Sequence, residues 1–165
     1  MPGDEVILLA PSWASYEPML EFIGAKPVHV QVRKDNFHPD LDAIKNAITE
    51  RTKMILINSP CNPTGAVFTP EEIEGILDIA TENDLWIVSD EIYSRMVWVD
   101  WPHVSPASLP GGSERTIVVN GWSKSWAMTG MRLGFITGPP NAVKAAIKSQ
   151  ANSASHVPTL SLIHI

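Results

Sequence analysis

The chain has 165 residues, 44% of them apolar, and a formal net charge of −6, which is the composition of an ordinary globular domain. The acidic balance and the lack of a basic cluster argue against a nucleic-acid partner. No apolar run approaches the ~20 residues that cross a bilayer, so we expect no membrane partner either. A single cysteine and the lack of a visible signal peptide favour a cytoplasmic protein.

The first third of the chain alternates between strand and helix patterns. A strand is predicted for residues 5–10 and a helix for residues 16–23. Apolar and polar residues alternate over 27–32, which predicts a second strand, and residues 41–48 have the pattern of a short amphipathic helix. The apolar run 54–58 predicts a third strand.

The clearest helix signal follows this third strand. Thr69 is a good N-cap, Pro70 suits the first helical position, and Glu72 completes a capping box. Apolar residues then recur at helical spacing over 73–80, and the helix should end near Asn83.

The second half of the chain contains fewer helix signals. Apolar runs at 85–89 and 116–120 predict two more strands. Between them, residues 98–112 form a proline-rich loop without periodicity, and loops of that length are usually functional. The run 133–137 predicts another strand, and residues 141–150 a final helix.

Three polar segments are attached to the central strands. They are Asn-Ser-Pro-Cys-Asn-Pro-Thr-Gly at 58–65, Val-Ser-Asp-Glu-Ile-Tyr at 88–93, and the run from Gly121 to Gly134 that contains Ser-Lys and Gly-Met-Arg-Leu-Gly. Each follows a short apolar run rich in β-branched residues, as buried strands of a parallel sheet do. A helix pattern lies between the first two strands, so they form a βαβ unit.

These segments predict one shared site. Ligands of open α/β sheets bind outside the carboxyl ends of the strands, so Asn62, Asp90, Tyr93 and Lys124 should converge at one edge. Arg132 instead precedes its strand. If Arg132 shares the site with Lys124, the strand after it must begin at that edge, and we therefore predict that it runs antiparallel to its neighbours.

The residues at this edge suit a phosphorylated aldehyde. The amine of Lys124 can form a Schiff base with an aldehyde. The guanidinium of Arg132 can hold phosphate through a forked pair of hydrogen bonds.

Four motifs together resemble a known family. They are Pro-Ser-Trp at 11–13, Asn-Pro-Thr-Gly at 62–65, Asp-Glu-Ile-Tyr at 90–93, and Ser-Lys with Gly-Met-Arg-Leu-Gly within 123–134. In order and spacing they resemble the fold-type I, pyridoxal-phosphate-dependent aminotransferases of the class I/II superfamily, most closely the bacterial aspartate/aromatic branch. The resemblance implies an α/β fold of three α/β/α layers, whose sheet is mostly parallel with one antiparallel strand.

The resemblance assigns the chemistry to Lys124 and Asp90. Lys124 would be the catalytic residue that forms a Schiff base with pyridoxal 5′-phosphate and moves a proton between the substrate and the cofactor. Asp90 would lie against the pyridine nitrogen and favour its charged form, which makes the ring an electron sink.

The remaining cofactor-binding residues follow from the same resemblance. Tyr93 and Asn62 would hydrogen-bond the phenolic oxygen of the ring. Arg132 and Ser123 would contact the phosphate. Trp13 would stack on the ring face.

Several other residues have ordinary interpretations. Cys61 is better explained as a small buried filler than as a nucleophile. Glu91 is expected to be structural or solvent-facing. The five histidines lack metal-ligand spacing, so no metal site is predicted. Trp122 and Trp126 flank Lys124 and could wall its pocket or pack in the core, and the sequence leaves both interpretations open.

The resemblance also implies that the chain is a fragment. Residues 1–159 would be part of the large, cofactor-binding domain, and residues 160–165 depart from the family pattern as an atypical tail. An upstream phosphate-binding loop and a downstream small domain, which normally supplies an arginine for the substrate carboxylate, would be absent. Because these parts would be missing, and because family members are homodimers with sites at the interface, we expect the fragment alone to be inactive.

The implied function is transamination in amino acid metabolism. An amino acid, aspartate or an aromatic one, would exchange its amino group with 2-oxoglutarate by a ping-pong mechanism. The visible motifs also suit other chemistry of the same cofactor, such as that of a lyase or a cyclopropane-forming synthase. A non-enzymatic cofactor-binding regulator domain is a third possibility.

Overall fold

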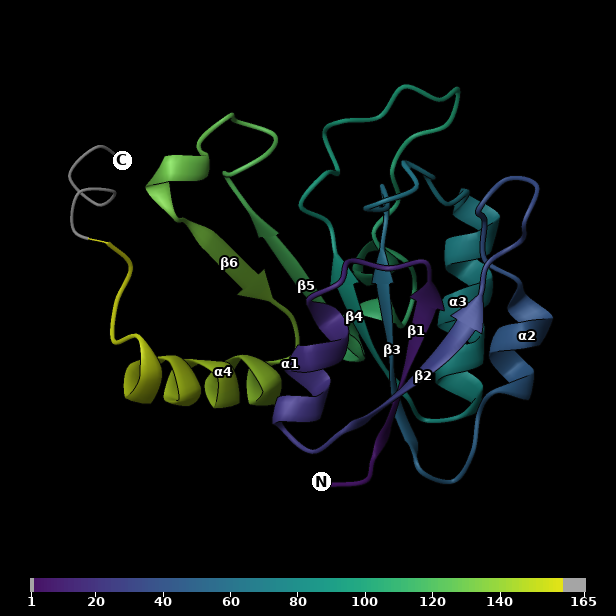
Figure 1. Cartoon of the computed structure of the whole chain (residues 1–165), viewed down its shortest axis with the longest axis horizontal. Helices are drawn as coiled ribbons and strands as arrows, with labels where there is room; N and C mark the ends of the chain where they lie inside the picture. Colours follow the sequence, from purple (N-terminus) through teal and green to yellow (C-terminus); the bar gives the residue numbers. More distant parts are fainter. Residues whose placement is uncertain (1, 159–165) are drawn as a thin grey trace.

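The sheet is the framework of the fold. The computed structural model describes residues 2–158, which form a six-stranded sheet of order β2-β1-β3-β4-β5-β6 (Figure 1). All neighbouring strands are parallel except β5 and β6, which are antiparallel. The strands are β1 (Glu5–Ala10), β2 (Lys26–Gln31), β3 (Thr52–Asn58), β4 (Trp86–Asp90), β5 (Thr116–Gly121) and β6 (Gly134–Thr137).

In the described part of the chain, four α-helices connect or follow these strands, close to where the sequence predicts them. They are α1 (Tyr16–Phe22), α2 (Leu41–Asn46), α3 (Pro70–Glu82) and α4 (Pro140–Ser153). The proline-rich loop is less irregular than predicted, because it contains the short 3-10 helix η1 (Pro106–Ser108) and runs into a second, η2 (Gly112–Glu114). A third, η3 (Thr129–Met131), precedes β6.

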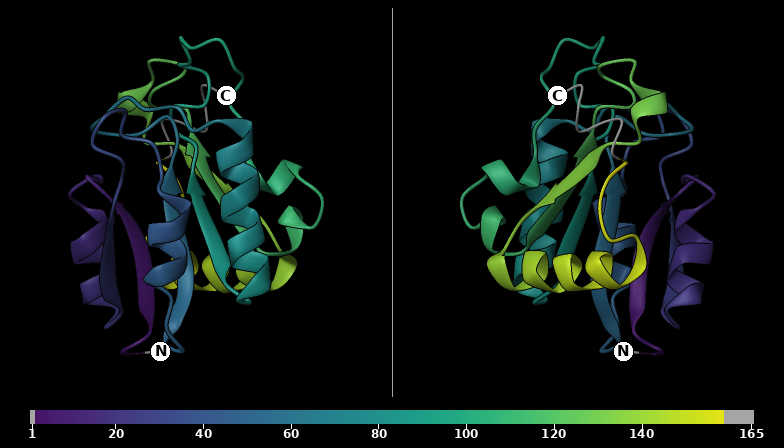
Figure 2. Two further views of the ribbon diagram at one scale, coloured as in Figure 1. Left: turned by 90° about the vertical axis from the view of Figure 1, so that its right-hand side faces the viewer. Right: turned by 90° about the vertical axis from the view of Figure 1, so that its left-hand side faces the viewer.

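Strand β1 is buried on both faces, and its side chains alternate between two cores. Ile7 and Leu9 belong to the larger core, which includes residues of α2 and α3. Val6 and Leu8 belong to a smaller core with Tyr16 of α1. The sheet therefore carries α2 and α3 on one face and α1 on the other, and α4 lies on the side of α1 (Figures 1 and 2). This arrangement confirms the predicted three-layer α/β/α fold.

Strand β6 confirms the predicted change of direction. Gly121, the last residue of β5, pairs with Gly134, the first residue of β6. A Cβ at Gly121 would lie 2.7 Å from the carbonyl oxygen of Leu133, so glycine allows the two strands to approach closely here. The segment between the two strands leaves and returns at the same edge of the sheet.

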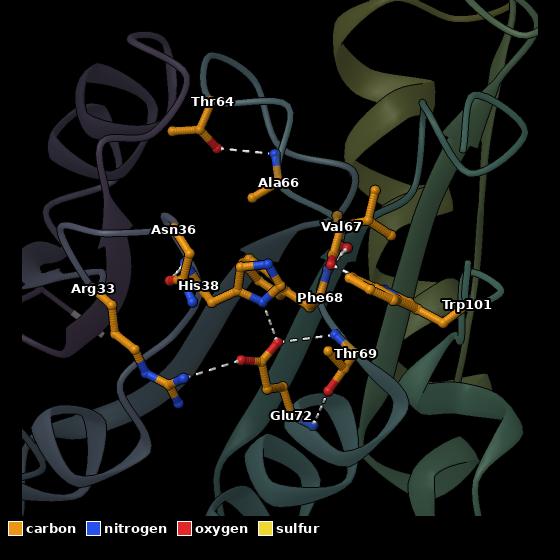
Figure 3. Close-up of polar contacts among 11 residues, drawn as sticks. Arg33, Asn36, His38, Thr64, Ala66, Val67, Phe68, Thr69, Glu72 and Trp101 are labelled. Atoms are coloured by element: carbon orange, nitrogen blue, oxygen red, sulfur yellow. Dashed lines mark hydrogen bonds and ion pairs between the residues drawn. The ribbon is translucent and has the colours of Figure 1, made fainter. Parts of the chain in front are cut away.

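The N-terminus of α3 forms the predicted capping box. The Thr69 hydroxyl accepts from the Glu72 amide at 3.2 Å, and the Glu72 carboxylate accepts from the Thr69 amide at 2.9 Å. The same carboxylate contacts two residues of the loop after β2: His38 Nδ1 lies 2.7 Å from Glu72 Oε2, and Arg33 Nη1 lies 3.8 Å from Oε1 (Figure 3). Glu72 is thus a buried junction between α3 and that loop.

This junction also supports the segment between β3 and α3. The ring of His38 lies near those of Phe68 and Trp101, at centroid distances of 6.4 and 6.2 Å (Figure 3). Trp101 Nε1 donates to the carbonyl of Val67 at 3.2 Å, and the amide of Phe68 donates to the Ser59 hydroxyl at 2.9 Å. The loop that carries Asn62 is therefore anchored at the end that joins α3.

The sequence also predicts that no segment crosses a membrane and that residues 160–165 form an atypical tail. Within residues 2–158, no helix is both long and apolar enough to cross a membrane. The atypical tail predicted at 160–165 lies outside the described residues, and the assignment of residues 1–159 to a partial large domain stays a prediction.

We predict that Glu72→Ala destabilises the chain by about 2–3 kcal/mol, because it removes a cap and leaves the partly buried His38 nitrogen and Thr69 amide without their acceptor. The measurement is urea unfolding followed by far-UV circular dichroism. Glu74→Ala, at an exposed position of the same helix, is the matched control and should change stability by less than about 0.5 kcal/mol. Equal losses in the two variants would contradict the assigned role of Glu72.

Candidate active site

One cavity at the carboxyl edge of the sheet brings the predicted site residues together. Its volume is about 490 Å³, within the usual range for cofactor and small-molecule sites. All of the predicted residues line it, and they come from segments throughout the chain: Trp13, Asn62, Asp90, Tyr93, Ser123, Lys124 and Arg132. Their shared location supports the predicted convergence, while their individual binding roles stay predictions.

Asp90 is the last residue of β4, and its carboxylate accepts two hydrogen bonds from the described residues. Its Oδ2 accepts from the Tyr16 hydroxyl at 2.6 Å, and its Oδ1 accepts from the Ile92 amide at 3.1 Å. The two oxygens thus have separate donors, one from a side chain and one from the main chain. This arrangement fixes the plane of a carboxylate at the wall of the cavity.

Asn58 connects Asp90 to the loop that contains Asn62. It is the last residue of β3 and lies opposite Asp90 in the parallel register. Its Nδ2 donates to the Asp90 carbonyl at 2.9 Å, and its Oδ1 accepts from the Asn62 amide at 2.8 Å. A single side chain therefore sets the spacing between two of the predicted binding residues.

Lys124 and Tyr93 approach each other across the cavity. Lys124 follows β5, Tyr93 follows β4, and the Lys124 Nζ lies 5.7 Å from the centroid of the Tyr93 ring. Lys124 is exposed, so its amine is accessible from the solvent. An accessible amine next to a phenol can react with an aldehyde held in the cavity.

Arg132 lines the cavity from the segment that joins β5 to β6, two residues before β6 begins. It directly follows η3 and has the left-handed backbone angle φ of +54°. Its Nη1 donates to the carbonyl of Thr129 at 3.0 Å, and its side chain is exposed. With Ser123 lining the same cavity, it offers a guanidinium and a hydroxyl that suit an anion.

Trp13 borders the cavity beside Tyr16. The two rings meet edge to face, with centroids 5.3 Å apart and an interplanar angle of 88°. Trp13 remains 41% exposed, whereas Tyr16 is only 7% exposed. A partly exposed indole at the rim provides a flat surface on which an aromatic ligand could stack.

Tyr16 keeps its proton. Burial is the main cause that raises the pKa of the Tyr16 phenol, and the hydrogen bond to the Asp90 carboxylate raises it further. The hydroxyl is therefore a permanent donor to Asp90 rather than a group that exchanges protons.

Tyr16 and Asn58 are site residues that sequence reasoning did not single out. The sequence predicts Tyr16 only as the start of a helix, and Asn58 only as the end of a strand and the first residue of the polar segment 58–65. The Tyr16 partner lies 74 positions away in the sequence, so no local pattern contains this contact. For Asn58, the signal was its place at the end of a predicted strand, at the same edge as Asp90.

The structure also resolves the open interpretations of residues near the motifs. Neither Trp122 nor Trp126 lines the cavity: Trp122 packs edge to face on Phe135 at 5.5 Å. Trp126 lies under the guanidinium of Arg95 and is 50% exposed, so the core-packing interpretation is wrong for it as well. Cys61 is partly buried and lines a neighbouring, mainly apolar cavity of about 470 Å³.

Glu91 is buried, as a structural role requires. It accepts from the Ser89 hydroxyl at 3.0 Å and lies 3.3 Å from His103 Nε2.

Among residues 2–158, no group of three or more His, Cys, Asp and Glu side chains could hold a metal ion.

The side chains that border the cavity suit the functional groups of pyridoxal phosphate. An amine, a carboxylate, a guanidinium with a hydroxyl, and a flat aromatic surface are each available to a different part of that molecule, and all border the cavity.

Comparison with known sequences points to one family. Residues 1–162 match the sequence model of the family described as aminotransferase class I and II. The chain is 45% identical over 154 residues to an aspartate aminotransferase of Pyrococcus abyssi, covering 93% of this chain and 40% of that protein. It is 41% identical over 160 residues to an aspartate/prephenate aminotransferase of Thermus thermophilus, covering 96% and 41% respectively.

Solved structures agree with the sequence comparison. A Thermus thermophilus aspartate aminotransferase mutant superposes with a TM-score of 0.93 at 41% identity, covering 98% of this chain and 44% of that chain. An aromatic aminotransferase from Pyrococcus horikoshii superposes with a TM-score of 0.91 at 44% identity, covering 94% and 42% respectively. The chain spans about two fifths of the length of the curated relatives it matches. On the strength of the matched family model, the chain belongs to the class I and II aminotransferases.

Proposed function

We propose that this chain is the central, cofactor-binding part of an enzyme that exchanges an amino group between an amino acid and a 2-oxo acid. The observation that carries the proposal is that Lys124, Asp90 and Arg132 line one cavity together with the other predicted residues. Family membership supports the same conclusion.

Lys124 is the proposed catalytic residue. When bound, pyridoxal phosphate supplies an aldehyde that condenses with amines and a ring that accepts electron density from the substrate. The Lys124 amine would hold the cofactor covalently until an amino acid displaces it. The freed amine would then carry the proton that leaves the substrate Cα, as a general base and afterwards a general acid.

Asp90, Asn62 and Tyr93 would orient the ring of the cofactor. The Asp90 carboxylate, fixed on both oxygens, supplies a negative charge that favours a protonated ring nitrogen. The Asn62 amide and the Tyr93 hydroxyl would donate to the ring oxygen. Because Asn58 links Asn62 to Asp90, these contacts share one rigid support.

The remaining residues would hold the phosphate and cover the ring. Arg132 and Ser123 would bind the phosphate, since a guanidinium pairs with phosphate oxygens through a forked hydrogen-bond pattern. Trp13 would stack on the ring with the part of its indole that stays exposed.

The names of the relatives favour a particular substrate class. They are described as aspartate, aspartate/prephenate and aromatic aminotransferases. We therefore propose aspartate or an aromatic amino acid as the amino donor and 2-oxoglutarate as the acceptor, in a ping-pong sequence.

We further propose that the complete protein is a cytoplasmic homodimer and that this chain alone does not turn over. Lys124 and Arg132 are exposed, so the cavity does not exclude water as a working active site does. Large apolar side chains also lie open, such as Phe22 at 91% and Trp98 at 84% exposure, which suits surfaces that further chain or a second subunit covers.

The first prediction from this proposal concerns covalent attachment. Mixed with pyridoxal phosphate, the chain should develop the absorbance band of a Schiff base, displaced from that of the free cofactor, and borohydride should make the link permanent. Peptide mass spectrometry should then locate the cofactor on Lys124.

The controls separate the site from surface lysines. Lys124→Ala should lose the band, whereas Lys144→Ala, an exposed lysine of α4, should retain it. A band that survives Lys124→Ala, or no band in the wild type, would contradict the proposed cofactor site.

The second prediction concerns the phosphate. Arg132→Ala should weaken pyridoxal phosphate binding by about 10- to 100-fold, because it removes hydrogen bonds to a charged group. It should leave the affinity for pyridoxal, which lacks the phosphate, within about twofold. Arg95→Ala is the control, since Arg95 lies over Trp126 outside the cavity lining. An equal loss for both ligands would argue against a phosphate contact.

The third prediction concerns the reaction. The complete protein that contains this chain should convert aspartate and 2-oxoglutarate to oxaloacetate and glutamate, with parallel lines in double-reciprocal plots. Lys124→Ala should lower turnover by at least about 100-fold, and the isolated chain should form no glutamate. Product formation without a 2-oxo acid would favour lyase chemistry, and intersecting lines would exclude the ping-pong sequence.

A further inference from the structure

We propose that Tyr16 is a positioning residue for the cofactor and that it acts through Asp90. Its hydroxyl would hold the carboxylate in the one orientation that meets a ligand ring bound in the cavity. The inference rests on the proposed function, because it concerns how the same site binds its cofactor.

The hydrogen bond from Tyr16 is short and comes from a rigid support. The Tyr16 ring belongs to the smaller core with Val6, Leu8 and Leu20, so its hydroxyl emerges from packed apolar side chains. It meets Asp90 Oδ2 at 2.6 Å, the distance of a hydrogen bond to a charged acceptor. A phenol held in this way cannot follow the carboxylate to another rotamer, so it selects one.

The remaining acceptor capacity of Asp90 is available to a ligand. A carboxylate offers about four lone-pair positions on its two oxygens. Within the part of the chain that the structure describes, Tyr16 and the Ile92 amide occupy one position on each oxygen. Because Asp90 lines the cavity, a donor on a bound ring can use the positions that remain.

Tyr16 also fixes the wall on which the ring would stack. Its amide donates to the Trp13 carbonyl at 3.1 Å, and its ring supports the indole edge to face at 5.3 Å. One residue thus sets the position of both the carboxylate at the ring nitrogen and the aromatic surface over the ring. The contacts that Asp90 and Trp13 would make to the ligand ring thus both depend on Tyr16, the first residue of α1.

The protonation of Tyr16 excludes a different role. Burial and the neighbouring carboxylate both raise the pKa of its phenol, so it remains a donor at any working pH. A group that keeps its proton throughout does not serve as the acid or base of the reaction. The hydroxyl of Tyr16 therefore contributes by orienting the Asp90 carboxylate.

A double-mutant cycle on cofactor affinity tests the inference. Pyridoxal phosphate is titrated into the wild-type chain, Tyr16→Phe, Asp90→Ala and the double variant, and the borohydride-trapped fraction of Lys124 is measured. We expect Tyr16→Phe to weaken binding about five- to tenfold in the wild type and less than about twofold when Asp90 is absent. If Asp90→Ala prevents trapping, Asp90→Asn replaces it, because a neutral amide accepts a weaker hydrogen bond.

Leu20→Ala separates positioning from packing. It removes a side chain from the same small core without touching Asp90, so its effect on affinity should be the same in both Asp90 backgrounds. Urea unfolding without cofactor gives the stability of each variant. Tyr16→Phe keeps the ring and should therefore lose less stability than Leu20→Ala.

The outcomes distinguish this inference from the proposed function. If the wild-type chain does not bind pyridoxal phosphate, the proposed site falls, and this inference falls with it. If the wild type binds but Tyr16→Phe binds equally well, or loses the same factor in both Asp90 backgrounds, only the role of Tyr16 is overturned.

Discussion

The amide of Asn58 holds the carboxyl edge of the sheet together. The parallel register of β3 and β4 sets Asn58 opposite Asp90, and its side chain bridges the Asp90 carbonyl and the Asn62 amide. At 7% exposure it has little access to water, so moving either loop would leave a buried polar group unpaired, at a cost of about 1–3 kcal/mol. The register of β3 and β4 therefore sets the distance between the two loops.

Much of this arrangement follows from patterns that are local in the sequence. The capping box at Thr69 and the apolar runs before Asn58 and Asp90 give the central βαβ unit, because hydrogen-bonded caps and buried parallel strands have recognisable compositions. The rule that ligands bind at the carboxyl ends of strands then brings Asn62 and Asp90 together. Requiring Arg132 at the same edge was enough to predict the reversed direction of β6.

Contacts between distant segments were beyond sequence reasoning. A tyrosine at the start of an amphipathic stretch is most simply a core residue, and Tyr16 is one; only the packing of α1 on the sheet brings its hydroxyl to Asp90. The same limit applied to Trp122, where motif position suited a pocket wall as well as core packing. Its contact with Phe135 depends on the pairing of β5 with β6, which no motif encodes.

The two sides of the cavity differ in construction. Asp90 and Tyr16 belong to the packed layers, where neighbouring side chains leave few alternative positions. Lys124 and Arg132 instead lie on the exposed segment between β5 and β6. Arg132 adopts a left-handed backbone conformation, which costs a non-glycine residue about 1–2 kcal/mol and which glycine adopts freely. Stability and anion binding thus favour different amino acids at position 132, so selection for thermal tolerance alone would act against the guanidinium.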